Sequence, residues 1–439
     1  MSDKNPASVK APSGNPWGWI PSVYIAEGLP YFAVNVLTVI MYTNLGIPKA
    51  QMTFYTGLLY LPWVIKPFWS PFIDIIRTKR WWTLLMQLAI CVSMGLAALF
   101  ISTSSFFTST LIVFWLMAFF SATHDIAADG FYMMALDEEK QAAYVGVRST
   151  FYRIASVLGQ GGVVILAGWL ETKYNDIPLA WSITFTSLSL FFLLIFLWDL
   201  FMMPSPEKDR PLPGIKAGHI LKEFCNTFIT FFKKKHIGIA LLFILLYRLP
   251  EALCLKLVQP FLLDSTANGG LGLTTAEVGM ANGTVGVLCL LAGGILGGIY
   301  IARRGLKKSL WPMALALTIP CFVYCLFAFY LPQSIVLISC GLGFEQFGYG
   351  FGFTAYMVYL MYFSAGESQT SHYAFCTAFM ALGMMIPGMF AGWIFNVCEK
   401  FGNFIVMSQA GYVIFFFFIM STCILTFYAV FKVLPTLKK

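Results

Sequence analysis

The stretch PSPEKDRPLPGIKAGHILKEFCNTFITFFKKKH, residues 204–236, divides the chain into two parts of similar length. It is the only long polar segment between apolar ones, and it contains seven Lys and Arg residues. On each side lie apolar runs of about 20 residues or more, the length that a helix needs to cross a bilayer. We count six runs in residues 17–203 and six in residues 237–431, with polar tails at 1–16 and 432–439. The sequence therefore predicts an all-α polytopic membrane protein with twelve transmembrane helices in two six-helix halves.

The composition excludes a soluble protein. Of the 439 residues, 59% are hydrophobic and 11% are charged, and the mean hydropathy is +0.76. An ordinary soluble domain has about 25% charged residues. The aromatic share of 17% also excludes a disordered chain, which needs few aromatic residues. The first sixteen residues are polar and Pro-rich and lack the basic region and cleavage site of a signal peptide, so we expect them to form a short cytoplasmic tail.

Basic residues are distributed unevenly between the two predicted sides of the membrane. With twelve spans and a cytoplasmic amino terminus, the cytoplasmic segments hold twenty Lys and Arg residues, whereas the opposite side holds Lys49, Lys173 and Lys400. The remaining five of the 28 lie inside spans. Such a bias is typical of the cytoplasmic side, so we expect both termini there. The net charge of +8 then reflects membrane orientation, and we expect no nucleic-acid partner.

The two halves of the sequence resemble each other. Tyr24 and Glu27 precede Pro30 in the first span, and Tyr247 and Glu251 flank a proline in the seventh. The tripeptide AGW occurs at 167–169 and again at 391–393. Parallel six-helix repeats joined by a basic linker resemble the plan of the major facilitator superfamily, in which the halves rock about a cavity at the membrane midplane.

Ionisable side chains inside the spans are candidates for function, because each costs about 2.5 to 3.5 kcal/mol at the bilayer centre on insertion scales. In SATHDIAADG, residues 121–130, Asp125 and Asp129 are four residues apart and share one helix face. Two carboxyl groups so close in a poorly solvated site favour the retention of one proton. We predict that Asp125 and Asp129 couple transport to protons, assisted by Glu27 and His124. The alternative is a static network with the basic residues of neighbouring spans, Lys66, Arg148 and Arg153.

A second group of ionisable residues is predicted to bind the solute. Its members lie in spans two, five, seven and ten, and they are Lys66, Arg153, Arg248, Glu251, Lys256 and Glu345. Arg offers a fixed fork suited to carboxylate or phosphate groups, so the basic members favour an anionic solute. Alternatively, Arg248 and Glu251 pair with each other at a spacing of three. Glu345 stands in the Gly-rich GLGFEQFGYGFG, where close helix packing is an equal alternative.

The cytoplasmic end of the second span carries a third group, Asp74, Arg77 and Arg80, which we interpret as a conformational latch. The chain has no Gly-Lys dipeptide, so it lacks a Walker A loop for ATP. It also lacks the HExxH and GxSxG motifs, and its four His residues are widely spaced. We therefore expect a protein that is not an enzyme and has no metal or cofactor, with a proton gradient as its driving force.

Five stretches resemble one known family, the AmpG muropeptide permeases, and more distantly the acetyl-coenzyme A transporters. They are GLPYFA in span one, KPFWSPFID (66–74), SATHDIAADG (121–130), the region 245–288 that begins LLYRLPEA, and FEQFGYGFGFTAYMVYLM (344–361). The resemblance implies that Lys66, Asp125, Asp129, Arg153, Arg248, Glu251 and Glu345 are family polar positions. It also implies proton-driven uptake of N-acetylglucosaminyl-anhydro-N-acetylmuramic acid, with or without a stem peptide. The setting it implies is the bacterial inner membrane and the recycling of cell-wall material, and we expect a monomer.

Three positions depart from the family pattern. His124 stands where Gln is usual, Glu27 where a small residue is common, and Pro250 where the family has Gly. Solute contacts diverge while a scaffold persists, so these changes leave the ligand open. One alternative is a transporter of acetyl-coenzyme A or of another organic or phosphorylated anion. Another is a membrane sensor that binds a solute without transporting it.

Overall fold

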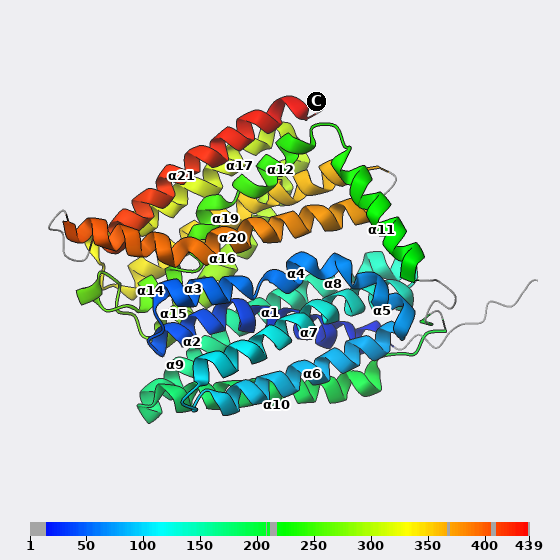
Figure 1. Ribbon diagram of the computed structural model, residues 1–439, viewed down its shortest axis with the longest axis horizontal. Coiled ribbons are helices and arrows are strands. Elements are labelled where there is room, and N and C mark those ends of the chain that lie inside the picture. The colour runs from blue at the N-terminus through cyan, green and yellow to red at the C-terminus, as the bar shows by residue number, and fades with distance from the viewer. Residues whose placement is uncertain (1–14, 208, 211–216, 367–368, 405–409, 438–439) are drawn as a thin grey trace, which may run out of the picture.

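The computed structural model describes residues 15–207, 209–210, 217–366, 369–404 and 410–437. Every regular element in these ranges is a helix, which confirms the predicted all-α class. Ten helical stretches are long and apolar enough to cross a membrane. Figure 1 shows two layers of roughly parallel helices, with the N-terminal half in blue to teal below and the C-terminal half in green to red above.

The N-terminal half contains five of the ten stretches. They are formed by α1 (Ile20–Phe32), the π-helical turn η2 (Ala33–Leu37) and α2 (Thr38–Asn44); α6 (Lys79–Phe100); α7 (Phe106–Ala135); α8 (Glu138–Val157), η4 (Leu158–Gly162) and α9 (Val163–Tyr174); and α10 (Ile177–Met202). The predicted second span is broken into α3 (Lys49–Leu58), α4 (Leu61–Ile65), η3 (Lys66–Phe68) and α5 (Ser70–Ile76). Prolines at 62, 67 and 71 stand near the starts of α4, η3 and α5, because proline lacks the N–H that a helix interior needs.

The C-terminal half repeats this plan. Its elements are α12 (Ile237–Leu246), α13 (Leu249–Leu255) and α14 (Val258–Leu263); α15 (Thr275–Val278), η6 (Gly279–Gly286) and α16 (Val287–Arg304); α17 (Leu306–Thr318), η7 (Ile319–Cys321) and α18 (Phe322–Tyr330); α19 (Ile335–Ser364); α20 (Gln369–Phe404); and α21 (Gly411–Val433). The helix α19 has 30 residues but is not among the ten apolar stretches. Its glycines together with Glu345 and Gln346 lower its hydropathy.

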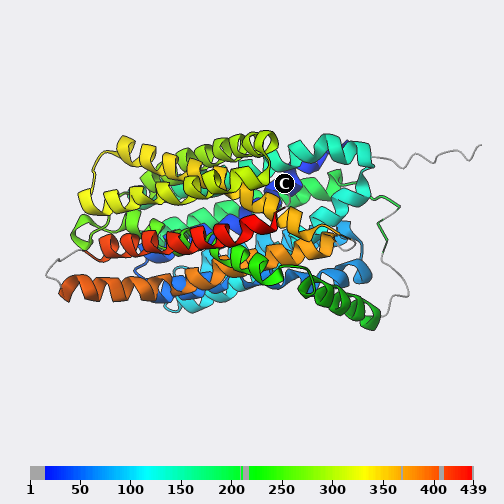
Figure 2. The same ribbon diagram turned by 90° about the horizontal axis from the view of Figure 1, so that it is seen from above.

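The segment predicted as a polar linker contains a helix, α11 (Ala217–Phe232). Phe231 of α11 is buried, and its ring lies 5.5 Å from that of Phe375 and 6.1 Å from that of Phe379, both on α20. Just beyond α11, the Lys234 ammonium donates to the carbonyls of Phe363 and Ala365, and burial lowers the pKa of this group. Figure 2 shows α11 splayed from one end of the bundle. This helix therefore ties the linker to the C-terminal half.

The halves pack backbone against backbone at two places. A methyl group added at Gly283 of η6 would lie 1.8 Å from the carbonyl oxygen of Gln160 in η4. A methyl group at Gly392 of α20 would lie 2.5 Å from the carbonyl oxygen of Lys49 in α3. Only glycine permits such an approach between helices.

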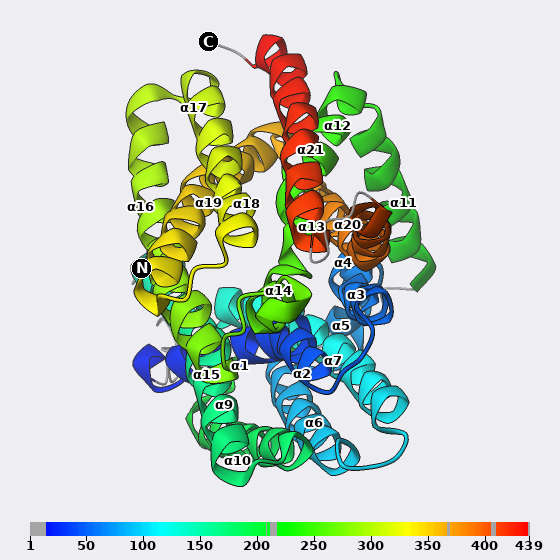
Figure 3. The same cartoon turned by 90° about the vertical axis from the view of Figure 1, so that its left-hand side faces the viewer.

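Polar contacts join the halves at the end away from α11. Thr275 of the C-terminal half donates to Glu171 of the N-terminal half at 2.5 Å and accepts from Asn44 of the N-terminal half at 2.7 Å. The Lys49 ammonium lies 2.7 Å from Asp264, which also accepts from the Tyr412 hydroxyl at 2.7 Å. Figure 3 faces this end, where α14 and α15 of one half meet α2 of the other. The distribution of basic residues predicts that this is the non-cytoplasmic end, and here the halves are closed.

Candidate functional site

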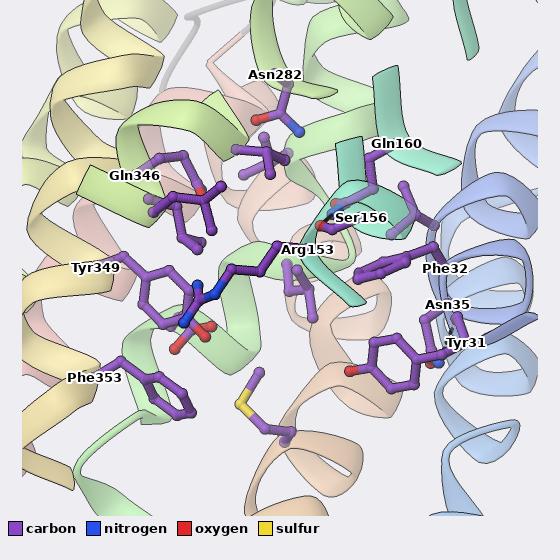
Figure 4. Close-up of a pocket in the computed structure, with 18 of the residues that line it drawn as sticks. Tyr31, Phe32, Asn35, Arg153, Ser156, Gln160, Asn282, Gln346, Tyr349 and Phe353 are labelled. Carbon is purple, nitrogen blue, oxygen red and sulfur yellow. Dashed lines mark hydrogen bonds between the residues drawn. The ribbon is translucent and has the colours of Figure 1, made fainter. Parts of the chain in front are cut away.

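A cavity of about 510 Å³ lies between the two halves. Residues of α1, η2, α8 and η4 line it from the N-terminal half, and residues of α13, α14, η6, α16 and α19 line it from the C-terminal half. Figure 4 shows Tyr349 and Phe353 on one wall and Tyr31 and Asn35 on the opposite wall. A concave site with aromatic walls and a few convergent polar groups is the usual form of a small-molecule site.

Arg153 projects into the middle of this cavity from α8 (Figure 4). Asp137 caps the start of this helix: its carboxylate accepts from the backbone N–H of Lys140 at 2.9 Å, and this bond lowers the pKa of Asp137. No carboxylate among the described residues forms an ion pair with Arg153, and its side chain is exposed to the cavity. A guanidinium without a counterion is a ready partner for an anionic group of a solute.

Arg248 faces the cavity from the C-terminal half but is already paired. It stands at the break between α12 and α13, where Pro250 occupies the first turn of α13. Its Nε and Nη2 atoms donate to the two oxygens of Glu251 at 2.8 Å each, and Nη2 also donates to the Tyr349 hydroxyl at 2.7 Å. The structure therefore matches the sequence alternative in which Arg248 and Glu251 pair with each other.

Glu345 of α19 lines the same cavity and is 5% exposed. One of its oxygens, Oε2, accepts from the Tyr324 hydroxyl at 2.9 Å and from the Gln346 amide at 2.8 Å. Both donors are neutral, and no basic side chain in the described part of the chain forms an ion pair with Glu345. The cavity thus holds an unpaired cation on one half and an unpaired carboxyl group on the other.

A charged cluster on the N-terminal half borders the cavity. Lys66 of η3 forms an ion pair with Asp125, and Arg148 of α8 lies 2.6 Å from Asp129. The Tyr24 hydroxyl donates to Asp129 at 3.2 Å, and the Arg148 guanidinium lies over the Tyr24 ring at 4.7 Å. Two of the three basic residues named in the static alternative, Lys66 and Arg148, therefore form ion pairs with the aspartates, whereas Arg153 forms none among the described residues.

Glu27 completes this cluster and lines the cavity. It stands three residues after Tyr24 on α1, and the Tyr24 hydroxyl donates to Asp129. Among the described residues, none forms a hydrogen bond with its buried Oε2 atom. Three carboxyl groups thus accompany two cations, and in the described part of the chain Glu27 is the one without an ion pair.

Of the residues predicted to bind the solute or to couple protons, five do not line the cavity: Lys66, Asp125 and Asp129 of the N-terminal cluster, and Lys256 and His124. Lys256 is 3% exposed, and its ammonium donates to the carbonyls of Asn35 at 3.4 Å and Thr56 at 3.2 Å, both in the other half. His124 is fully buried in α7, and no described residue forms a hydrogen bond with either of its ring nitrogens. The structure therefore places Lys256 in a contact between the halves and His124 in the interior of the N-terminal half.

The predicted latch is partly described. The side chain of Asp74 lies outside the described residues. The Arg77 guanidinium stacks over the Trp81 ring at 6.0 Å. Arg80 donates to the carbonyls of Leu200 at 2.6 Å and Met203 at 3.1 Å, at the end of α10. Arg80 therefore connects α6 to α10 within one half.

Sequence reasoning missed several polar residues at these sites. Asp209 of the linker accepts from the backbone N–H groups of Lys79 and Arg80 at 2.6 and 2.9 Å, and so caps the start of α6. Asn35, Gln160, Asn282 and Gln346 line the cavity. Isolated uncharged residues inside apolar helices carry little signal, although the Gly-rich flanks of Gln160 and Asn282 mark the irregular turns η4 and η6.

Comparison with known proteins agrees with this architecture. The family model of the Major Facilitator Superfamily matches residues 22–386. The chain is 24% identical to a putative transporter AmpG 4 of Rickettsia conorii over 87% of this chain and 90% of that protein. It is 25% identical to the anhydromuropeptide permease of Escherichia coli K12 over 88% of this chain and 75% of that protein.

Solved structures share the fold at low sequence identity. A bacterial homologue of the lysosomal transporter Spinster superposes with a TM-score of 0.73 at 14% identity, and the match covers 95% of each chain. A D-xylose–proton symporter superposes with a TM-score of 0.67 at 13% identity over 94% of this chain and 95% of that one. The chain therefore belongs to the major facilitator superfamily of membrane transporters, and its relatives include AmpG permeases.

Proposed function

We propose that this protein imports anhydromuropeptides or related muramyl amino sugars by proton symport, for the recycling of cell-wall material across a bacterial inner membrane. The observation that carries the proposal is the cavity between the halves, in which Arg153 is the cation left without an ion pair among the described residues. Homology to AmpG permeases over most of the chain narrows the class of solute. The carboxylate of a muramyl lactyl ether is the kind of group that Arg153 would bind.

The polar lining suits a sugar-like solute better than a polyphosphate. Arg248 is committed to Glu251, and Lys66 to Asp125, so the cavity is less basic than the sequence alone indicates. A polyphosphate such as coenzyme A would require several free cations. Amide side chains at Asn35, Gln160 and Gln346 and the hydroxyls of the lining tyrosines instead offer neutral hydrogen bonds. This balance favours the muramyl sugar over the alternative of a phosphorylated anion.

The N-terminal cluster supports proton coupling by its charge balance. With all three carboxyl groups ionised, Glu27, Asp125 and Asp129 would outnumber Lys66 and Arg148 by one charge. An uncompensated charge away from water costs several kcal/mol, so uptake of one proton makes the cluster neutral. Glu27 and Arg148 line the cavity, so opening the cavity to either side would change the hydration of the cluster.

Alternating access follows from where the halves touch. They are held together at the end away from α11 by the Thr275–Glu171 and Lys49–Asp264 contacts, and the cavity lies inward of that closure. A solute that contacts both halves, together with a proton that neutralises the N-terminal cluster, favours conformations in which the halves approach each other around the cavity. Solute and proton are thereby carried together.

Uptake into proteoliposomes tests the solute assignment. The probe is labelled N-acetylglucosaminyl-anhydro-N-acetylmuramic acid, and the variant is Arg153→Gln, with Arg303→Gln at the exposed end of α16 as the matched control. We expect Arg153→Gln to raise KM at least tenfold, since a charge-assisted hydrogen bond contributes about 1.5 to 3 kcal/mol. Arg303→Gln should behave as wild type. Equal KM values for both variants would contradict the assignment.

A further inference from the structure

Most charged groups around the cavity form ion pairs with each other. Apart from Glu27 of the N-terminal cluster, two described groups at opposite walls do not. Arg248 pairs with Glu251, and Arg148 pairs with Asp129. In the described residues this leaves Arg153 on α8 and Glu345 on α19 as the free cation and the free carboxyl group of the solute-facing walls. One belongs to the N-terminal half and the other to the C-terminal half.

Only one of the two carboxyl oxygens of Glu345 accepts hydrogen bonds from described residues. Both of its described hydrogen bonds, from Tyr324 and Gln346, reach Oε2, and no described residue donates to Oε1. Oε1 is also not among the buried atoms that lack a partner. Since Glu345 lines the cavity, this second oxygen is positioned to meet a solute. The two donors fix the orientation of the side chain without neutralising its charge.

Arg248, the basic residue that lines the cavity from this half in the described part of the chain, cannot serve as the counterion. The Arg248 fork is occupied by both oxygens of Glu251 and by the Tyr349 hydroxyl. A carboxylate that is 5% exposed and bonded only to neutral donors is costly until a positive charge reaches it. A hydroxyl group of a solute would add another neutral donor, whereas a primary ammonium group supplies three donors and the missing charge.

We propose that Glu345 binds a primary ammonium group of the solute while Arg153 binds its anionic group, so that the site prefers a solute with both charges. The inference rests on the proposed function in taking this cavity as the solute site. The ammonium group could belong to a stem peptide or to an amino sugar whose amine is not acetylated. A solute with both charges would link the two halves through Arg153 and Glu345, which is the bridging that closure around the cavity requires.

Equilibrium binding to the purified full-length protein tests this preference without requiring transport. Four probes are compared: the disaccharide N-acetylglucosaminyl-anhydro-N-acetylmuramic acid, the same disaccharide with a stem peptide that carries a free amine, that peptide form with its amine acetylated, and the disaccharide with glucosamine in place of N-acetylglucosamine. We expect at least one amine-bearing probe to bind at least tenfold more tightly than its acetylated counterpart. The probe that gains identifies whether the peptide or the sugar supplies the ammonium group.

Variants then assign the preference to a residue. Glu345→Gln should bring the Kd values of the amine and acetylated forms within twofold of each other, while Glu399→Gln, an exposed carboxylate on α20, should keep the wild-type ratio. Tyr324→Phe removes one donor to Oε2 but keeps the charge, so it should retain most of the ratio.

Two results would overturn the inference. One is equal Kd values for the amine and acetylated forms in the wild type, and the other is an unchanged ratio in Glu345→Gln, whatever that variant does to the response to a proton gradient. Gradient-driven uptake without an ammonium preference would refute this inference alone. An ammonium preference without gradient-driven uptake would refute only the proposed transport.

Discussion

Removing the Lys49 ammonium should open the end of the molecule at which the halves are closed. Lys49 of the N-terminal half and Asp264 of the C-terminal half lie 2.7 Å apart, with side chains 25% and 17% exposed. A fully buried pair costs about 3 to 5 kcal/mol to break, and an exposed pair about 0 to 1 kcal/mol. For a partly exposed pair that also holds Tyr412, Lys49→Met should cost the closed state about 1 to 2 kcal/mol.

This cost converts into a measurable change in population. Each 1.4 kcal/mol changes an equilibrium constant about tenfold, so the ratio of open to closed molecules should rise by about five- to thirtyfold. Positions 173 and 267 are exposed on the two halves near this end. Double electron–electron resonance between spin labels at these positions measures the distance between the labels. Lys400→Met is the matched control, because Lys400 is exposed near the end of α20. Identical distance distributions for Lys49→Met and wild type would refute the closure by this ion pair.

Three further predictions concern the cluster and the packing of the halves. Glu27→Gln mimics the protonated carboxyl group, so it should abolish gradient-driven accumulation while solute exchange without a gradient persists; loss of both activities would count against a coupling role. Lys66→Met leaves Asp125 without its cation, so thermal unfolding should show a free energy of unfolding lower by about 1 to 3 kcal/mol, a smaller loss than for a fully buried pair. Adding Asp125→Asn to this variant should restore part of the lost free energy. Gly283→Ala places a methyl group against the Gln160 carbonyl, so the spin-label distance across the closed end should lengthen, whereas Gly238→Ala, which meets no neighbouring atom, should leave it unchanged.

The fold could be predicted from the sequence because helices that cross lipid require long apolar runs. Apolar runs of sufficient length, the basic linker and the excess of basic residues on one side were enough to predict two six-helix halves. Local pairing was also accessible, since Arg248 and Glu251 stand three residues apart on one helical turn. The broken second span could be anticipated from its prolines, whereas the helix α11 inside a polar linker could not.

Partners from distant spans could not be predicted. Which cation meets Asp125 and which meets Asp129 depends on how η3, α7 and α8 pack, and a single sequence does not encode that packing. The direction in which a side chain points could not be predicted from the sequence either. Lys256 stands five residues beyond Glu251, yet it points at backbone carbonyls of the other half instead of the cavity. The sequence therefore predicted a mostly basic cavity, whereas in the structure the positive and negative side chains that line the cavity nearly balance.

Gradient-driven uptake tests the central claim most directly. Labelled N-acetylglucosaminyl-anhydro-N-acetylmuramic acid is offered to proteoliposomes with and without an inward proton gradient, for wild type, Asp125→Asn and Asp129→Asn. Either substitution leaves two carboxyl groups for two cations, so the cluster no longer needs a proton to be neutral. The account predicts accumulation above equilibrium by wild type only when the gradient is present, and its loss in both variants. No accumulation by folded wild-type protein, or undiminished accumulation by both variants, would contradict it.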